Sequence, residues 1–326
     1  MEKNKKAKKI VILTSGGDAP GMNQCISALV RTSLNLGLQP YGVRDGIKGL
    51  CEGEIFPLTR NFIQGLARRG GTILYTSRYP EFQRLEVQER CAARLKAEGI
   101  DSVVMLGGDG TEKGARALAQ LGIQTILIPA SVDNDVPGTD FSIGFYSAVA
   151  SCVHSIDQIR DTMESHSRLF IVQTMGRRCP DIALYSGFAS GADLILTQAD
   201  CPEYPEILRR VREIKARGQR YCLIVMSENL IDGQKLSQDL ARDSGYETRY
   251  DVLGHTQRGG SPAPQDRILA QVFGAEAAKA ASEGQISGTI GVQNETILLN
   301  NFSKNIIKLR VPRETTMVLE AERKAR

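Results

Sequence analysis

The sequence lacks several features that mark whole classes of protein. It contains no Trp and only 6% aromatic residues, so it offers no platform on which the bases of a nucleic acid would stack. No apolar run approaches the roughly 20 residues that span a bilayer, and the N-terminus lacks the apolar core of a signal peptide. We therefore expect a cytoplasmic protein that binds neither nucleic acid nor membrane.

Metal-binding spacing and strong charge are also missing. The seven Cys residues occur singly, without a C-x-x-C pair, and the three His residues are dispersed, which argues against a Cys- or His-based metal site. Isolated cysteines in odd number indicate inert thiols in a reducing compartment. The net charge is only +4, and its visible basic run, 3–9, is expected to be a solvated tail.

The composition that remains is that of a soluble globular enzyme. The 326 residues, 24% charged and 41% hydrophobic, are enough for about two domains. Short β-branched runs alternate with amphipathic stretches, and no Pro- or Ser-rich linker divides the chain. We predict parallel sheets with helices on both faces, in two lobes that exchange chain with each other. The predicted strands are 9–14, 39–44, 102–106, 125–128, 169–174, 193–196, 221–226 and 247–253, with a glycine-rich turn at 45–51.

One stretch, 129–140 (P-A-S-V-D-N-D-V-P-G-T-D), directly follows a predicted buried strand. Ligands bind at the carboxyl ends of strands in open α/β sheets. Asp133 and Asp135 would share a face of an extended segment, and two such carboxylates favour a cation such as Mg²⁺ between them. The alternative is an ordinary Asn/Asp/Gly turn.

Two glycine-rich segments also lie between a predicted strand and a predicted helix. Segment 15–23 (S-G-G-D-A-P-G-M-N) allows close approach of a ligand to the backbone, or forms a plain tight turn. Segment 107–111 (G-G-D-G-T) combines backbone donors for phosphate oxygens with one carboxylate for a metal. The same string occurs in NAD and diacylglycerol kinases, so it indicates a nucleotide phosphate.

Six motifs, in order and with similar spacing, resemble the bacterial ATP-dependent 6-phosphofructokinase family. They are 13–23, 107–111, 133–135, 138–140, 175–177 (M-G-R) and 254–262 (G-H-T-Q-R-G-G-S-P). The resemblance extends from about residue 9 past residue 294. It implies two similar Rossmann-like lobes with mainly parallel sheets and helices on both faces. It also implies transfer of the γ-phosphoryl group of ATP to the 1-hydroxyl of fructose 6-phosphate, with Mg²⁺, in glycolysis.

The resemblance also implies roles for individual residues. Asp133 would be the base that faces the sugar hydroxyl, Arg177 would stabilise the phosphoryl group in flight, and Asp109 and Asp135 would hold the metal. The implied nucleotide residues are Gly17, Arg78, Tyr79, Gly108, Asp109, Gly110, Thr111 and Gly114. The implied sugar-phosphate residues are Ser131, Asp133, Asp135, Arg168, Met175, Gly176, Arg177, Glu228, Arg249, His255 and Arg258.

Domain organisation and assembly follow from the same resemblance. Residues 1–144 plus 257–307 would form the ATP-binding lobe, and 145–256 plus 308–326 the sugar-phosphate lobe. Family members place Arg168 and Arg249 in the site of a neighbouring subunit. The chain is therefore expected to form at least a homodimer, with a homotetramer as the expected state.

The chain departs from the family pattern at two neighbouring positions. Ala130 and Ser131 stand where family members most often have Gly and Thr; Ser131 keeps the hydroxyl, so we expect an altered rate and not its loss. Pyrophosphate-dependent relatives usually have Asp at the place of Gly110 and Lys at the place of Ala130. Both differences favour ATP as the donor. The alternatives are a pyrophosphate-dependent or related sugar-phosphate kinase, and a catalytically idle regulatory paralogue.

A second set of departures concerns the allosteric effector site that family members form between subunits. The residues considered for this site are Arg31, Arg60, Arg160, Asp193, Arg217 and Arg220, of which the arginines keep the basic pattern. Asp193 departs from it, as do Ser27, Asn61, Gln219 and Tyr221. Fewer cations weaken an anion site, so we expect weakened or changed allosteric control.

Overall fold

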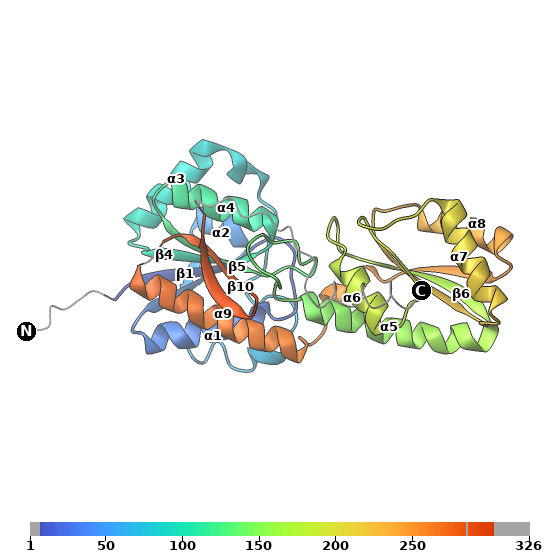
Figure 1. The fold of residues 1–326 in the computed structure, drawn as a ribbon. Coiled ribbons are helices and arrows are strands. Elements are labelled where there is room, and N and C mark those ends of the chain that lie inside the picture. The colour runs from blue at the N-terminus through green and yellow to red at the C-terminus, as the bar shows by residue number, and fades with distance from the viewer. Residues whose placement is uncertain (1–6, 285, 303–326) are drawn as a thin grey trace, which may run out of the picture. The chain divides into compact units, whose positions relative to one another are not determined.

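The computed structural model describes residues 7–284 and 286–302 and consists of two compact units (Figure 1). Within the described residues, the first unit comprises 7–146 and 258–302, and the second comprises 147–257. The chain leaves the first unit within helix α5 (Phe145–His166) and returns at the end of the 3₁₀ turn η3 (Gly254–Arg258). Residues 1–6 and 303–326, which the expected basic tail and lobe boundaries include, lie outside the described residues.

The first unit is built on a seven-stranded mixed sheet. Its central strands β1 (Lys9–Thr14), β4 (Ser102–Gly107) and β5 (Gln124–Pro129) are buried and parallel. In their register, Val11 pairs with Val103, and Val103 pairs with Thr125. Two edge strands, β3 and β11, are antiparallel to their neighbours. The strand order is β11 (Thr296–Asn301), β10 (Gly288–Gln293), β5 (Gln124–Pro129), β4 (Ser102–Gly107), β1 (Lys9–Thr14), β2 (Gln39–Val43) and β3 (Ile55–Pro57).

Helices cover both faces of this sheet (Figure 1). Alternate strand residues point to opposite faces, and Val11, Val103 and Leu127 pack with helices α2, α3 and α4 into one buried cluster. On the other face α1 packs along α9. The bounds of these helices are α1 (Met22–Asn35), α2 (Gly46–Glu52), α3 (Leu85–Ala97), α4 (Asp109–Gln120) and α9 (Pro264–Glu283), with 3₁₀ turns η1 (Leu66–Arg68) and η2 (Pro80–Gln83) between α2 and α3.

The second unit repeats the same layered plan on a smaller, wholly parallel sheet of order β7-β8-β6-β9. In β6, Leu169 and Ile171 join the cluster with α7 and α8, whereas Phe170 and Val172 join the cluster with α5 and α6. The two lobes are therefore both Rossmann-like, as predicted. The elements are β6 (Arg168–Thr174), α6 (Asp181–Ala189), β7 (Leu194–Leu196), α7 (Tyr204–Ala216), β8 (Cys222–Ser227), α8 (Gly233–Asp243) and β9 (Glu247–Val252).

The predicted glycine-rich turn at 45–51 is wrong, because this segment is helix α2. Asp45 and Gly46 take left-handed conformations (φ 56° and 62°), and the helix then buries Ile47 and Leu50 at helical spacing. The burial of this apolar pair outweighs the low helix propensity of glycine.

The hairpin of β10 and β11 also went unpredicted. Its turn residues Asn294 and Glu295 both have positive φ (47° and 64°), as a two-residue type I′ turn requires, but the usual signal of Gly at the second position is missing. Among the described helices, none is long and apolar enough to cross a membrane.

Candidate functional site

Three loops of the first unit meet at one edge of its sheet. They follow the carboxyl ends of the adjacent parallel strands β1, β4 and β5, and backbone hydrogen bonds join them. Ser15 N donates to Leu106 O (2.9 Å), and Ala130 N donates to Gly107 O (3.0 Å). The two glycine-rich segments and the aspartate-rich stretch therefore lie side by side, as expected for a ligand site at the carboxyl edge of a sheet.

The loop after β4 leads directly into helix α4, which begins at Asp109. Thr111 anchors it, because its buried hydroxyl donates to Ser15 O (3.0 Å), and a side chain at Gly107 would collide with that same carbonyl. A Cβ at Gly110, in contrast, would meet no heavy atom within 4 Å. The N-terminus of α4 thus lies beside open space at Gly110, and the Gly110 N–H donates to Asp109 Oδ1 (2.7 Å). A helix N-terminus with such space suits a phosphate group.

Gly114 has a different surrounding from the other glycines assigned to the nucleotide. It is buried in α4, and a Cβ there would lie 2.9 Å from Ile47 Cδ1 and 3.6 Å from Phe82. Gly114 therefore lies where α4 packs against its neighbours, one helical turn after Gly110.

The aspartate-rich stretch is a turn, so the expectation that Asp133 and Asp135 share a face of an extended segment is wrong. Asn134 takes a left-handed conformation (φ 54°), which its short polar side chain tolerates. That side chain fixes the turn, since Nδ2 donates to Asp140 O (3.0 Å) and Oδ1 accepts from Ser142 N (2.9 Å). The turn separates the surroundings of the two carboxylates.

Asp133 is 1% exposed and faces a cation of the same unit. Its Oδ2 lies 3.9 Å from Nη2 of Arg258, whose side chain is 14% exposed. Arg258 also donates from Nη1 to Asp18 O (3.1 Å) and lies directly against Gly17. The opposite charge offsets part of the cost of burying the carboxylate, and a side chain larger than Gly at position 17 would displace the guanidinium.

Ser131 and Asp135 form a second small group beside the α4 N-terminus. The Ser131 hydroxyl donates to Asp135 Oδ1 (3.1 Å) and accepts from Asp133 N (3.3 Å). A Cβ at Gly108 would lie 3.6 Å from Ser131 Oγ and 4.0 Å from Asp135 Oδ1. The hydroxyl therefore links the two aspartates of the turn and faces the glycine-rich segment 107–111.

The donor set at this edge fits Mg²⁺. Asp109 is half exposed and lies 3.7 Å from Lys113 Nζ, and Asp135 is partly buried. Carboxylate oxygens are the ligands that Mg²⁺ prefers, and it usually takes one or two of them together with water and phosphate oxygens. No group of three or more His, Cys, Asp or Glu side chains is placed to hold a metal within the part of the chain that the structure describes.

Arg78 and Tyr79 follow a segment that Asn23 holds in place. Asn23 Nδ2 donates to the carbonyls of Arg69 and Gly70 (3.2 and 3.1 Å), and Oδ1 accepts from Ile73 N (2.7 Å). Arg78 is exposed, and Tyr79 packs against the buried cluster of α2 to α4. Asn23 had no predicted role; the only signal was its position in the motif 13–23.

In the second unit, Met175, Gly176 and Arg177 form a tight loop after β6. Gly176 and Arg177 both have positive φ (139° and 51°), and their N–H groups donate to Glu228 Oε1 (3.1 and 2.9 Å). Glu228 follows β8, whose carboxyl end lies beside that of β6. The carboxylate predicted to contact the sugar phosphate therefore also fixes the loop that carries Arg177.

Two glutamines, the buried Gln257 and the exposed Gln198, complete this loop, and the sequence predictions gave neither of them a role. Gln257, fully buried, accepts from Met175 N through Oε1 (3.1 Å) and donates from Nε2 to Gly254 O (2.9 Å). Gln198 Nε2 donates to Arg177 O (3.0 Å). Neither residue type marks a site by itself, because each acts through contacts distant in sequence.

Arg168 and Arg249 share one carboxylate partner. Arg168 begins β6 and lies opposite Glu247 of β9 in the parallel register. Its Nε is 3.0 Å from Glu247 Oε2, and Arg249 pairs with Oε1 of the same residue. The two arginines, and hydrogen bonding to Arg168 above all, lower the pKa of Glu247. His255, at the other end of this strand, is exposed.

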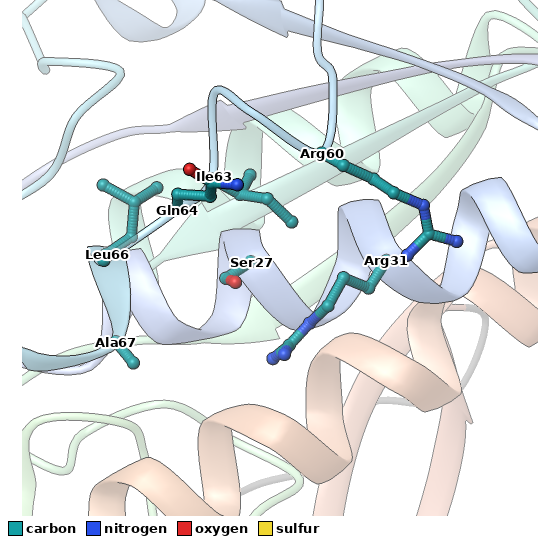
Figure 2. Close-up of a pocket in the computed structure, with 8 residues that line it drawn as sticks. Ser27, Arg31, Arg60, Ile63, Gln64, Leu66 and Ala67 are labelled. Atoms are coloured by element: carbon teal, nitrogen blue, oxygen red, sulfur yellow. The ribbon is translucent and has the colours of Figure 1, made fainter.

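The candidate effector residues of the first unit line a pocket of about 210 Å³ (Figure 2). Ser27 and Arg31 lie on α1, and Arg60 and the residues that follow it lie on the loop across from them. Arg31 Nη2 donates to Gln271 Oε1 (3.1 Å) and Arg60 Nη2 to Asn35 Oδ1 (2.6 Å). The pocket thus contains two cations whose side chains are already held by neutral groups. Its lining residues are Ser27, Arg31, Arg60, Ile63, Gln64, Gly65, Leu66 and Ala67.

The remaining candidate effector residues belong to the second unit. Asp193 and Arg217 line a pocket of about 560 Å³, where Asp193 accepts from Gln219 Nε2 (2.7 Å) and from Leu223 N (2.8 Å). Arg160 and Arg220 are not among its lining residues. Arg160 lies 6.0 Å from the ring centre of Tyr221, and Arg220 donates to Ser167 Oγ (3.2 Å). The pocket is lined by Asp193, Leu194, Arg209, Arg210, Glu213, Ile214, Arg217 and Gln219.

Comparison with known proteins gives a consistent result. The family described as Phosphofructokinase matches residues 9–281. A protein named ATP-dependent 6-phosphofructokinase from Lactobacillus gasseri is 43% identical over 290 residues, covering 89% of this chain and 91% of its own. One of the same name from Vibrio cholerae is 39% identical over 315 residues, covering 97% and 98%.

Solved structures agree with the sequence relatives. Phosphofructokinase from Saccharomyces cerevisiae matches with a TM-score of 0.82 and 31% identity over 98% of this chain. This chain spans 46% of that yeast chain. A pyrophosphate-dependent phosphofructokinase from Marinobacter aquaeolei, at 24% identity over 91% of this chain and 83% of its own, has the same fold (TM-score 0.76). The chain therefore belongs to the phosphofructokinase family.

Proposed function

We propose that this protein transfers the γ-phosphoryl group of MgATP to the 1-hydroxyl of fructose 6-phosphate, giving fructose 1,6-bisphosphate and ADP. The observation that carries the proposal is the position of Asp133. It is a buried carboxylate opposite Arg258, in the loop that follows β5 at the carboxyl edge of the sheet. The names of relatives near 40% identity over most of the chain support the same reaction.

Asp133 acts as the base that orients the sugar hydroxyl. An unperturbed aspartate is a weak base, but phosphoryl transfer passes through a loose transition state that needs little deprotonation of the attacking oxygen. Orientation and charge neutralisation therefore carry most of the rate. Arg258, held by Asp18 O, keeps a positive charge next to Asp133.

The nucleotide phosphates bind at the glycine-rich loops of the first unit, which contain Gly17, Gly108 and Gly110, with open space beside Gly110. Asp109 and Asp135 would hold Mg²⁺, which would neutralise negative charge on the phosphates. Ser131 donates to Asp135 and so positions one of these carboxylates. Its hydroxyl performs the part that Thr has in most family members.

In the second unit, we assign Arg177 to the phosphoryl group in transfer and Arg168, Arg249 and His255 to the sugar phosphate. Arg258 of the first unit is assigned to the sugar phosphate as well. The loop of Arg177 is preorganised, because Glu228 and Gln198 hold its backbone on both sides. Preorganised charge costs no rearrangement during the reaction.

ATP is the donor in this proposal. The space beside Gly110 is open, and Ala130, which is fully buried, supplies no cation for a pyrophosphate. The likeness to the pyrophosphate-dependent enzyme of Marinobacter aquaeolei concerns the fold alone at this level of identity.

The protein is assigned to the cytoplasm and to glycolysis, as a homo-oligomer, with a tetramer as the expected state. Its allosteric control is weakened or changed, since Ser27, Gln64 and Gly65 line the first pocket where further cations would strengthen an anion site. Strong activation by ADP and inhibition by phosphoenolpyruvate in a rate assay would refute this last point.

A coupled assay with a panel of donors and acceptors tests the proposal. Purified protein is given ATP or pyrophosphate, each with fructose 6-phosphate and with other sugar phosphates, and ADP or phosphate release is followed. Turnover with ATP and fructose 6-phosphate supports the proposal, whereas turnover with pyrophosphate alone contradicts it. Binding of ATP without turnover on any acceptor would favour the idle regulatory paralogue.

A further inference from the structure

Two of the cysteines lie together on packed helices of the first unit. Cys51 is at the end of α2, partly exposed, and Cys91 is in the middle of α3, 1% exposed. Both contact the same buried cluster, and the interaction with the other thiol is the largest influence on the pKa of each. Arg94, one turn after Cys91, donates from Nη1 to Cys51 O (3.1 Å), which independently fixes this face of α3 against Cys51.

The two thiols differ in a way that suits a reacting and a resolving cysteine. The hydrogen bond from Cys91 lowers the pKa of Cys51, and Arg90 and Arg94 lower it further, while burial and Glu52 oppose them. The hydrogen bond to Cys51 and burial raise the pKa of Cys91. Thiolate character and access to solvent decide which cysteine an oxidant attacks, so Cys51 is the reacting partner.

We propose that Cys51 and Cys91 are a redox modification site, which forms a reversible disulfide when the protein meets a hydroperoxide. The Cys51 thiolate attacks one peroxide oxygen, the O–O bond breaks, and the products are the Cys51 sulfenic acid and hydroxide, which a proton converts to water. Cys91 then gives up its proton and attacks the Cys51 sulfur, and hydroxide leaves from that sulfur and takes up a proton to become water. In sum, two thiols and one hydrogen peroxide give one disulfide and two waters.

The site lies beneath the nucleotide loops of the same unit. Ile47 of α2 contacts α4 next to Gly114, and Asp45 O accepts from Ser77 Oγ (2.7 Å), the residue before Arg78. A disulfide between α2 and α3 would restrict the movement of α2, which packs beneath these loops. Disulfides in reducing compartments are usually transient and redox-sensing, which is the role assigned here. The formation of the disulfide does not rest on the proposed kinase activity.

Mass spectrometry of the intact full-length protein tests the proposal without an activity assay. The wild type is treated with a few equivalents of hydrogen peroxide, alkylated, and digested without reductant. We expect a loss of 2 Da, a crosslinked 51–91 peptide, and return of both thiols with dithiothreitol. A rise in Tm of at least a few degrees should accompany the bond, because it closes a long loop.

Variants distinguish the pair from general oxidation. Cys91→Ser should leave Cys51 as a sulfenic acid that a dimedone probe labels, and Cys51→Ser should give neither label at this site nor crosslink. Cys201→Ser is the matched control, since Cys201 is exposed and burial and nearby carboxylates raise its pKa; it should crosslink like the wild type. Oxidation of Cys201 with Cys51 and Cys91 still reduced, or oxidation of Cys51 without the crosslink, would overturn the proposal.

Discussion

The guanidinium of Arg258 lies 3.9 Å from the carboxylate of Asp133, and only 14% and 2% of the two side chains are exposed. The residues are more than a hundred positions apart in sequence: Asp133 lies in the loop after β5, and Arg258 ends the 3₁₀ turn η3. A buried carboxylate that loses its cation is destabilised by several kcal/mol. Loss of this pair is therefore expected to affect both the stability of the site and its proposed chemistry.

Replacement of Arg258 should separate these two effects. Arg258→Ala leaves Asp133 without its opposite charge, and we expect kcat/KM for fructose 6-phosphate to fall by about 100-fold or more, which is about 3 kcal/mol. Arg258→Lys keeps the charge but loses the planar fork that also reaches Asp18 O, so its loss should be smaller. Steady-state kinetics of both variants measure this; equal losses would contradict a role for the charge.

Much of the fold and part of the site could be predicted from the sequence. Buried β-branched runs such as 102–106 gave the strands, and the rule that ligands bind at strand ends placed Asp133 near 107–111. Helix α2 was missed because its glycines concealed the buried pair Ile47 and Leu50. The turn at Asn134 was missed because its conformation depends on hydrogen bonds to Ser142 and Asp140. No local sequence pattern predicts these contacts.

The supporting residues were harder still to predict. Asn23, Gln198 and Gln257 act through hydrogen bonds to backbone groups between 21 and 82 positions away. Sequence spacing carries no information on such contacts, and only the resemblance to a family located the loop of Arg177 at all.

Glu228 should matter through the Arg177 loop. Glu228→Ala leaves the N–H groups of Gly176 and Arg177 without their acceptor, at a cost of about 1–3 kcal/mol for the buried Gly176. We expect kcat to fall by at least about tenfold. Glu228→Gln keeps an acceptor oxygen and should retain more activity than Glu228→Ala. If the two variants are equally impaired, the carboxylate acts on substrate and not through the loop.

Gly110 and Gly107 should respond differently to alanine. A Cβ at Gly110 meets no protein atom within 4 Å, so Gly110→Ala should leave Tm nearly unchanged but raise KM for ATP several-fold, because the methyl group enters the space assigned to phosphate. At Gly107 the Cβ would collide with Ser15 O and Thr111, so Gly107→Ala should lower Tm by several degrees. Thermal unfolding and ATP kinetics of both variants check this, and a wild-type KM in Gly110→Ala would exclude that phosphate position.

Glu247 should affect sugar-phosphate binding through Arg168 and Arg249. Its pKa is lowered by these arginines, so both pairs are present at neutral pH and are lost only as the pH falls through that lowered pKa, below the ordinary value of about 4.3. Glu247→Gln removes the charge, and we expect KM for fructose 6-phosphate to change about threefold or more with little change in kcat. The matched control is Glu276→Gln, which breaks an exposed pair with Lys279 on α9. The same change in both variants would deny Glu247 any specific role.

The central claim is that Asp133 is the base that faces the sugar hydroxyl, and one measurement tests it most directly. The kcat of wild type, Asp133→Asn and Asp101→Asn is compared in a coupled assay with saturating ATP and fructose 6-phosphate. Asp101 is an exposed control, whose carboxylate accepts a hydrogen bond from Lys9 N (2.7 Å). We predict that Asp133→Asn lowers kcat by about 100-fold to 10,000-fold and that Asp101→Asn stays within twofold of wild type. A kcat within twofold of wild type for Asp133→Asn would contradict the account.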